Sequence, residues 1–250
     1  MAFTFNGTSC ETYDMHVEVY PVRPIPMRKQ TIYKVPGRSG DLIVDEDAYE
    51  NVQQEYEVYV NHASRNMQNN LIKIAKWLLE PSGYCELTDT YDSNIKRMAR
   101  FVGGMSFINS LNKYGKATAV FDCKPQRWPA ADPPRTGFLT ENAPVMLFIT
   151  EPNMLAGYPL LEITNVAANN SLLIESGTLR IVIPARGTAI SKIVVDWETQ
   201  SVYNAYNNSV PSNTTVTGEW AKIGDGDTIT ITNQSGPDMG YKMYRRMYYI

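Results

Sequence analysis

The sequence predicts a mainly β protein of two domains: an N-terminal β-structure that carries one amphipathic helix, and a C-terminal antiparallel β-sandwich. Short segments in which apolar and polar side chains alternate recur along the chain, as in half-buried strands. A single segment has helical periodicity instead, and one proline-rich segment interrupts the chain near its middle. A length of 250 residues is ample for two domains of ordinary size.

The proline-rich segment, 124–134, divides the chain. Its four prolines forbid a helix and disfavour a central strand. We therefore expect it to connect an N-terminal domain, 1–134, to a C-terminal domain, 135–250. Residues 135–158 look irregular, apart from an apolar run at 145–149 that suits one strand.

Several segments of the first domain have the two-residue period of strands. In 55–60, Tyr56, Val58 and Val60 share one face and two glutamates take the other. We expect further strands at 97–102 and 116–123, and a hairpin in which the turn Pro36–Gly40 joins strands at 31–35 and 42–44.

The helical segment runs from Ser64 to Glu80. Its apolar stripe recurs at spacings of four, three and four residues, through Met67, Leu71, Ile74 and Leu78. Ser64 is a suitable N-cap, and Pro81 ends the helix. We expect the stripe to pack against the sheet; the alternative is that part of it contacts a neighbouring subunit.

The second domain is all β by pattern. Short alternating segments are separated by Gly, Asn, Asp and Pro, which is typical of an antiparallel sandwich. They lie at 179–183, 190–195, 201–203 and 228–232. The apolar tail, 243–250, also alternates and is predicted as a terminal strand.

Composition argues against several chemistries. A net charge of −3 does not favour binding to a phosphate backbone. Cys10, Cys85 and Cys123 are too few and too scattered for a disulfide framework or a zinc site, so we expect buried free thiols. The two histidines, His16 and His62, lie in no catalytic or metal-binding motif. We therefore predict no catalytic residue, no metal site and no cofactor.

The segment Gly224–Thr228 contains two aspartates two residues apart, as calcium loops do. The glutamate that completes a calcium loop is missing, so a hairpin turn before strand 228–232 is the better interpretation.

Aromatic side chains of the second half suggest one alternative function. Exposed rings on a β-sandwich can stack on sugars, and Trp197, Trp220 and Tyr206 are the candidates. The competing interpretation is that these rings fill the core or an interface.

The N-terminus has no basic stretch followed by an apolar run, and no apolar run reaches the about 20 residues of a membrane span. We expect a protein that is made in the cytoplasm, is soluble there and has no membrane partner.

Several segments, in their order along the chain, resemble the distal tail (Dit) proteins of bacteriophages with long non-contractile tails. They are Phe3–Gly7, Tyr33–Leu42 with its Pro-Gly-Arg-x-Gly turn, Tyr49–Asn51, Trp77–Gly83, Phe121–Pro125 and Val194–Glu198. The resemblance covers most of the chain, and 135–158 is its poorest region.

This resemblance implies structural work rather than catalysis. In the family, six copies form a ring at the end of the tail tube, and DNA passes through its channel. The N-terminal domain builds the ring, and a galectin-like C-terminal sandwich contacts tail-tip and receptor-binding proteins. One ring face meets the tail tube and the other the tail-associated fibre protein. A chain of 250 residues resembles the short form, which lacks an inserted carbohydrate-binding module.

A closed ring needs a head-to-tail interface. We predict that the hairpin turn contributes to it, through Pro36, Gly37, Arg38 and Gly40, because an extended arm commonly pairs with a neighbouring sheet.

Overall fold

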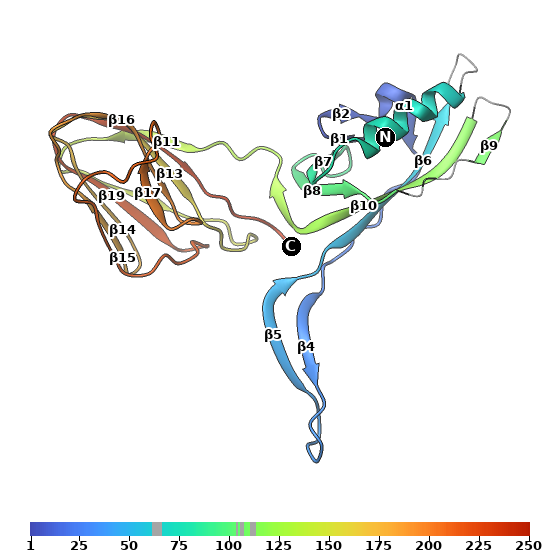
Figure 1. The fold of residues 1–250 in the computed structure, drawn as a ribbon, viewed down its shortest axis with the longest axis horizontal. Coiled ribbons are helices and arrows are strands. Elements are labelled where there is room, and N and C mark those ends of the chain that lie inside the picture. The colour runs from blue at the N-terminus through green and yellow to red at the C-terminus, as the bar shows by residue number, and fades with distance from the viewer. Residues whose placement is uncertain (62–66, 104, 106–107, 111–113) are drawn as a thin grey trace. The chain divides into compact units, whose positions relative to one another are not determined.

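The computed structural model describes residues 1–61, 67–103, 105, 108–110 and 114–250 (Figure 1). The chain forms two compact units: 1–131 together with Ile250, and 132–249. The division falls three residues before the boundary expected after residue 134. Each unit has its own cluster of buried apolar side chains.

Eight strands of the N-terminal unit form one antiparallel sheet within the described residues. Their order is β2-β1-β7-β8-β10-β6-β3, and β9 pairs with β10. The strands are β1 (Phe3–Phe5), β2 (Thr8–Ser9), β3 (Met15–Val17), β6 (Val52–Asn61), β7 (Cys85–Asp89), β8 (Ile95–Phe101), β9 (Ile108–Ser110) and β10 (Tyr114–Pro129). A short 3₁₀ helix, Cys10–Tyr13, links β2 to β3.

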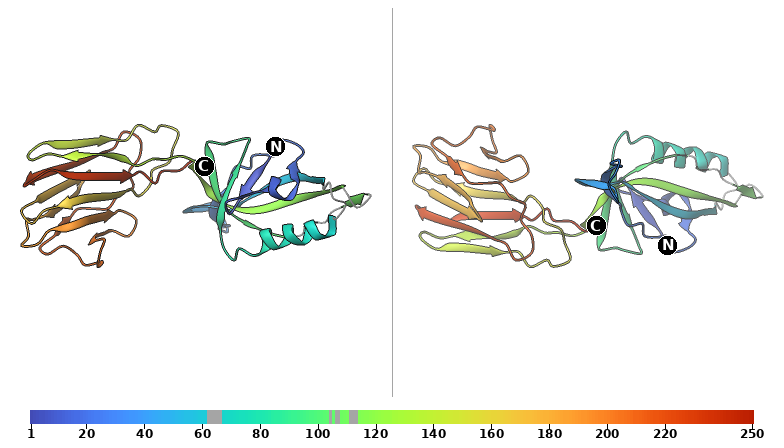
Figure 2. Two further views of the ribbon diagram at one scale, coloured as in Figure 1. Left: turned by 90° about the horizontal axis from the view of Figure 1, so that it is seen from above. Right: turned by 90° about the horizontal axis from the view of Figure 1, so that it is seen from below.

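The helix α1 (Met67–Leu79) covers one face of this sheet (Figure 2). Met67, Ile74 and Leu78 of the predicted stripe are buried, and Leu71 is half-buried. Trp77 fixes the packing, since its indole N–H donates to the Phe5 carbonyl at 3.1 Å. The predicted cap, Ser64, lies outside the described residues.

The strand β10 corrects the prediction of a linker that begins at residue 124. It continues through the first prolines and pairs Trp128 with Lys96 and Pro129 with Ile95 of β8. The register shifts between Cys123 and Arg127, so Pro125 occupies a bulge, where the missing backbone N–H is tolerated. Only 130–134 is left as a connector between strands.

A buried ion pair lies inside the N-terminal unit. Asp89 and Arg97, which are 7% and 3% exposed, approach to 3.4 Å. Asp89 also accepts hydrogen bonds from the Tyr56 hydroxyl at 2.9 Å and from the backbone N–H groups of Tyr91 and Asp92 at 3.1 and 2.8 Å. These bonds offset the cost of burying the carboxylate.

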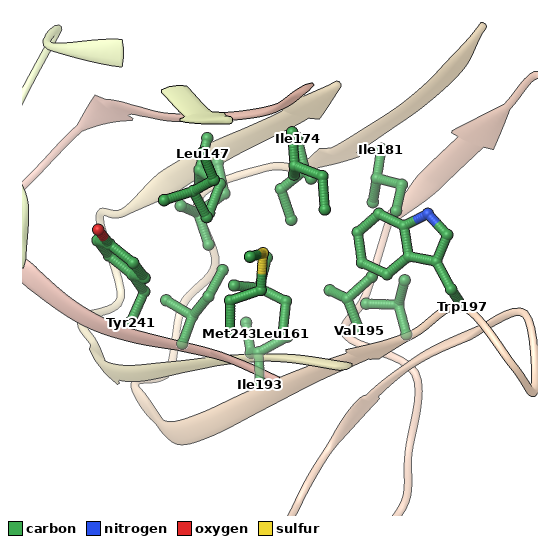
Figure 3. Close-up of a cluster of buried hydrophobic side chains, with 14 of the residues drawn as sticks. Leu147, Leu161, Ile174, Ile181, Ile193, Val195, Trp197, Tyr241 and Met243 are labelled. Carbon is green, nitrogen blue, oxygen red and sulfur yellow. The ribbon is translucent and has the colours of Figure 1, made fainter. Parts of the chain in front are cut away.

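The C-terminal unit is the predicted antiparallel sandwich. Two five-stranded sheets, ordered β11-β20-β13-β16-β17 and β12-β19-β14-β15-β18, contribute to one apolar core (Figure 3). The strands are β11 (Arg135–Leu139), β12 (Pro144–Phe148), β13 (Leu160–Val166), β14 (Ser171–Ser176), β15 (Leu179–Ile183), β16 (Ile190–Asp196), β17 (Ser201–Asn204), β18 (Thr215–Thr217), β19 (Thr228–Ser235) and β20 (Met239–Tyr244).

Two expectations for this unit were wrong. The segment 135–139, expected to be irregular, forms β11 and pairs with β20. The tail does not form a strand over 243–250, because β20 ends at Tyr244. Arg246 has φ +51°, which breaks the extended conformation, and Arg245 forms ion pairs with Asp132 and Glu151.

Candidate assembly surfaces

The predicted hairpin exists as a separate two-stranded ribbon. β4 (Arg28–Tyr33) pairs with β5 (Leu42–Tyr49), and neither strand joins another sheet in the described residues. Figure 1 shows β5 running on toward β6, so the ribbon is an extension of a strand that lies next to the edge of the sheet of the N-terminal unit.

The four predicted interface residues, Pro36, Gly37, Arg38 and Gly40, lie at the tip of the ribbon and are all exposed. A turn closes the tip, since the Arg38 N–H donates to the Val35 carbonyl at 3.2 Å. Gly37 and Gly40 have φ +81° and +85°, a conformation that other residues adopt at a cost. The structure therefore brings these residues together at one end of the ribbon.

Polar contacts at its root hold the ribbon in shape. Arg28 donates to Asp45 at 2.6 Å, and the Thr31 hydroxyl donates to Glu46 at 2.8 Å. The hydrogen bond from Arg28 lowers the pKa of the Asp45 carboxyl below its ordinary value. The Arg28 guanidinium also lies 5.4 Å from the Tyr49 ring centre. The ribbon is thus paired along its length without help from the rest of the unit.

Exposed apolar side chains concentrate on this ribbon and on the segment before it. Eleven of the 22 large hydrophobic side chains found exposed in the described residues lie between 19 and 44. They are Val19, Tyr20, Val22, Ile25, Met27, Ile32, Tyr33, Val35, Leu42, Ile43 and Val44. A concentration of exposed apolar side chains of this kind is typical of an interaction surface.

A second apolar surface lies beside α1. A groove of about 370 Å³ runs between the helix and the end of β8, with Leu71, Leu78 and Phe101 in its wall. Ile72 and Leu79 of the same helix are 62% and 63% exposed. Part of the helix surface that does not pack on the sheet is therefore apolar, and Gln68, Lys73 and Lys76 are exposed beside it.

The rings proposed for sugar stacking do not form a common platform. Trp197 is fully buried in the sandwich core, so its ring has no face exposed to a ligand. The prediction of Trp197 as a sugar-stacking residue was therefore wrong. Trp220 is partly buried and packs edge-on against it, with ring centres 5.5 Å apart. Tyr206 is 89% exposed, and no ring contact in the described residues joins it to either tryptophan.

The carboxylates of 224–228 cap backbone groups. Asp227 accepts from the Gly224 N–H and Asp225 from the Glu151 N–H, both at 2.7 Å. These bonds fix the turn that leads into β19. The turn is not the predicted hairpin, because β19 pairs with β12 and β14 and not with the preceding strand β18. Across the described ranges, no three His, Cys, Asp or Glu side chains gather as metal ligands do.

The cysteines are free thiols. Burial raises the pKa of Cys10 to about 11 and that of Cys123 to about 12, so both stay protonated near neutral pH. Cys85 is half-buried. His16 lies 3.8 Å from Glu11, and His62 lies outside the described residues. No helix in the described part of the chain is long and apolar enough to cross a membrane.

The crystal structure of the Dit protein of phage SPP1 has the same fold. The match covers 97% of this chain and 98% of that one, with a TM-score of 0.68 and 13% sequence identity. That protein is described as a paradigm of the hub adsorption apparatus in phages that infect Gram-positive bacteria.

No protein-family model matches the chain, and no curated protein sequence matches it. At 13% identity the likeness establishes the fold, and at that level the predicted resemblance to Dit proteins is confirmed.

Proposed function

We propose that this chain is a non-enzymatic structural protein of a phage tail, six copies of which close into a ring at the distal end of the tail. One ring face contacts the tail tube protein, and the other contacts tail-tip, fibre and receptor-binding proteins. DNA leaves through the central channel without specific binding. The protein assembles in the host cytoplasm and functions in the virion.

The exposed apolar ribbon is the observation that carries this proposal. A two-stranded ribbon has no core of its own and is marginally stable in water. Ile32 and Ile43 face each other across its strands and are 58% and 56% exposed. Contact with another subunit would bury them, and a head-to-tail contact between identical chains forms a ring when its rotation closes. The fold shared with a hub protein over nearly the whole chain supports the same conclusion.

Light scattering and negative-stain imaging of the purified protein test the proposal. We expect a concentration-dependent species with six times the chain mass of 28.2 kDa and annular particles with an open centre. A protein that stays monomeric at high concentration, with no rings in the images, would overturn the proposal.

A further inference from the structure

The segment 19–24, directly before the ribbon, forms a preformed hollow at the edge of the N-terminal unit. Together with β6 it encloses about 290 Å³. Tyr20 and Val22 in its wall are 77% and 81% exposed. Glu55 and Glu57 of β6 line the same hollow, and neither carboxylate forms an ion pair within the described residues.

Contacts from inside the unit hold this segment in place. The buried Gln54 side chain donates to the Val22 carbonyl at 3.0 Å. Arg23 lies 3.4 Å from Asp92, and the rings of Tyr20 and Tyr91 meet at 5.0 Å. The hollow therefore exists before any partner arrives, which lowers the entropic cost of binding there.

The ribbon tip has the complementary composition. Val35 is 42% exposed, and the cations Lys34 and Arg38 flank it along the chain. No ion pair in the described residues involves either cation. An apolar side chain between two positive charges matches an apolar hollow beside two negative charges.

The tip cannot reach the hollow of its own chain while the ribbon stays paired. Gly37 lies nine residues beyond Arg28 at the ribbon root, a span of about 30 Å for an extended strand. The hollow lies at the root, because 19–24 leads directly into β4 and β6 directly follows β5. A ribbon tip that enters this hollow must therefore come from a second copy.

We propose that the ribbon tip, 34–40, of one copy docks into the hollow formed by 19–24, Glu55 and Glu57 of the next copy. This inference rests on the proposed ring and names the acceptor surface of its interface. Each chain then offers a tip to one neighbour and a hollow to the other, as a head-to-tail ring requires.

Charge reversal tests the docking site. The tip variant K34E/R38E and the hollow variant E55K/E57K should each raise the protein concentration needed for half-assembly by about tenfold. The chain that carries all four changes, and an equimolar mixture of the two variants, should assemble as the wild type does. Glu219→Lys, an exposed reversal in the C-terminal unit, is the matched control and should have no effect.

Thermal unfolding of each variant checks that its units stay folded. Two outcomes would overturn the docking site while leaving the proposed ring intact. In the first, the wild type forms rings and the charge-reversed variants assemble equally well. In the second, the variants assemble less well, and neither the four-fold variant nor the mixture restores assembly. A wild type that forms no ring would overturn both.

Discussion

Replacing the isoleucines of the ribbon should weaken assembly without unfolding the subunit. The variant Ile32→Thr/Ile43→Thr changes a directly opposed pair and keeps β-branched side chains in both strands, so strand propensity is preserved. The pair makes no contribution to the buried core of the N-terminal unit. We therefore expect its free energy of unfolding to change by no more than about 0.5 kcal/mol per site.

The effect on assembly follows from the exposed fractions. Burying a whole isoleucine side chain contributes about 1.5–3 kcal/mol, and slightly more than half of the surface of each residue, 58% and 56%, remains to be buried. The pair then contributes roughly 2–3 kcal/mol to each subunit contact, which corresponds to a roughly 30- to 140-fold change in the association constant.

Light scattering across a dilution series measures this change, and circular dichroism melting confirms the fold. Phe148→Thr is the control, because Phe148 is 57% exposed and belongs to the C-terminal unit rather than to the ribbon. If the isoleucine variant assembles at the same concentration as the wild type, the ribbon is not the interface and the reasoning from its exposure is wrong.

Three further predictions concern the two units. Asp89→Ala should destabilise the N-terminal unit by about 3–5 kcal/mol, because Arg97 keeps a buried charge without its partner; a loss below 1 kcal/mol in urea unfolding would contradict this. Burial raises the folded-state pKa of Cys10 and Cys123 from 9.0 to about 11 and about 12. The folded state therefore holds these protons more tightly, and stability should fall as pH rises from 9 toward 12; replacing both thiols by alanine should flatten that fall, and an unchanged slope would refute the assignment. Gly157→Ala should destabilise the C-terminal unit by about 1–3 kcal/mol, because its Cβ would lie 2.2 Å from the Arg246 carbonyl oxygen; a melting temperature equal to that of the wild type would contradict this.

Most strands could be predicted because their side chains alternate between a wet and a buried face. The segment 179–183 forms β15 with the predicted bounds, since Leu179, Ile181 and Ile183 share its buried face and Gly177 lies in the preceding turn. β11 was missed because only Leu139 of its five side chains is buried, which leaves almost no apolar period to detect. The extended conformation of β11 depends instead on its pairing with β20.

The proline-rich segment shows why the rule that proline disfavours a strand gave the wrong prediction for 124–129. Proline excludes a strand only where its N–H would join the ladder. The register shift between Cys123 and Arg127 removes that requirement at Pro125. A shift of register depends on the partner strand β8, and the sequence of β10 alone contains no sign of it.

The candidate sites were predictable to different degrees. The turn residues Pro36–Gly40 predict a hairpin tip, because proline and glycine favour the backbone conformations of a tight turn. The burial of Trp197 was not predictable, since a tryptophan after an apolar strand fits a core and a binding platform equally well. The hollow was missed altogether, because it joins 19–24 to Glu55 and Glu57, which only the folded sheet brings together.

The ribbon itself illustrates why the assembly surface had to come from the structure. Two short strand segments, 31–35 and 42–44, on either side of a glycine-containing turn are the same signal that a half-buried hairpin of a sheet would give. What distinguishes the ribbon is that both of its faces are exposed, with Ile32 and Tyr33 on successive positions of β4 at 58% and 53%. Apolar residues on both faces of a strand are normal when two layers cover it. One chain supplies no cover for this ribbon in the described residues, so the ribbon satisfies the ordinary rule for buried strands only when another chain covers it.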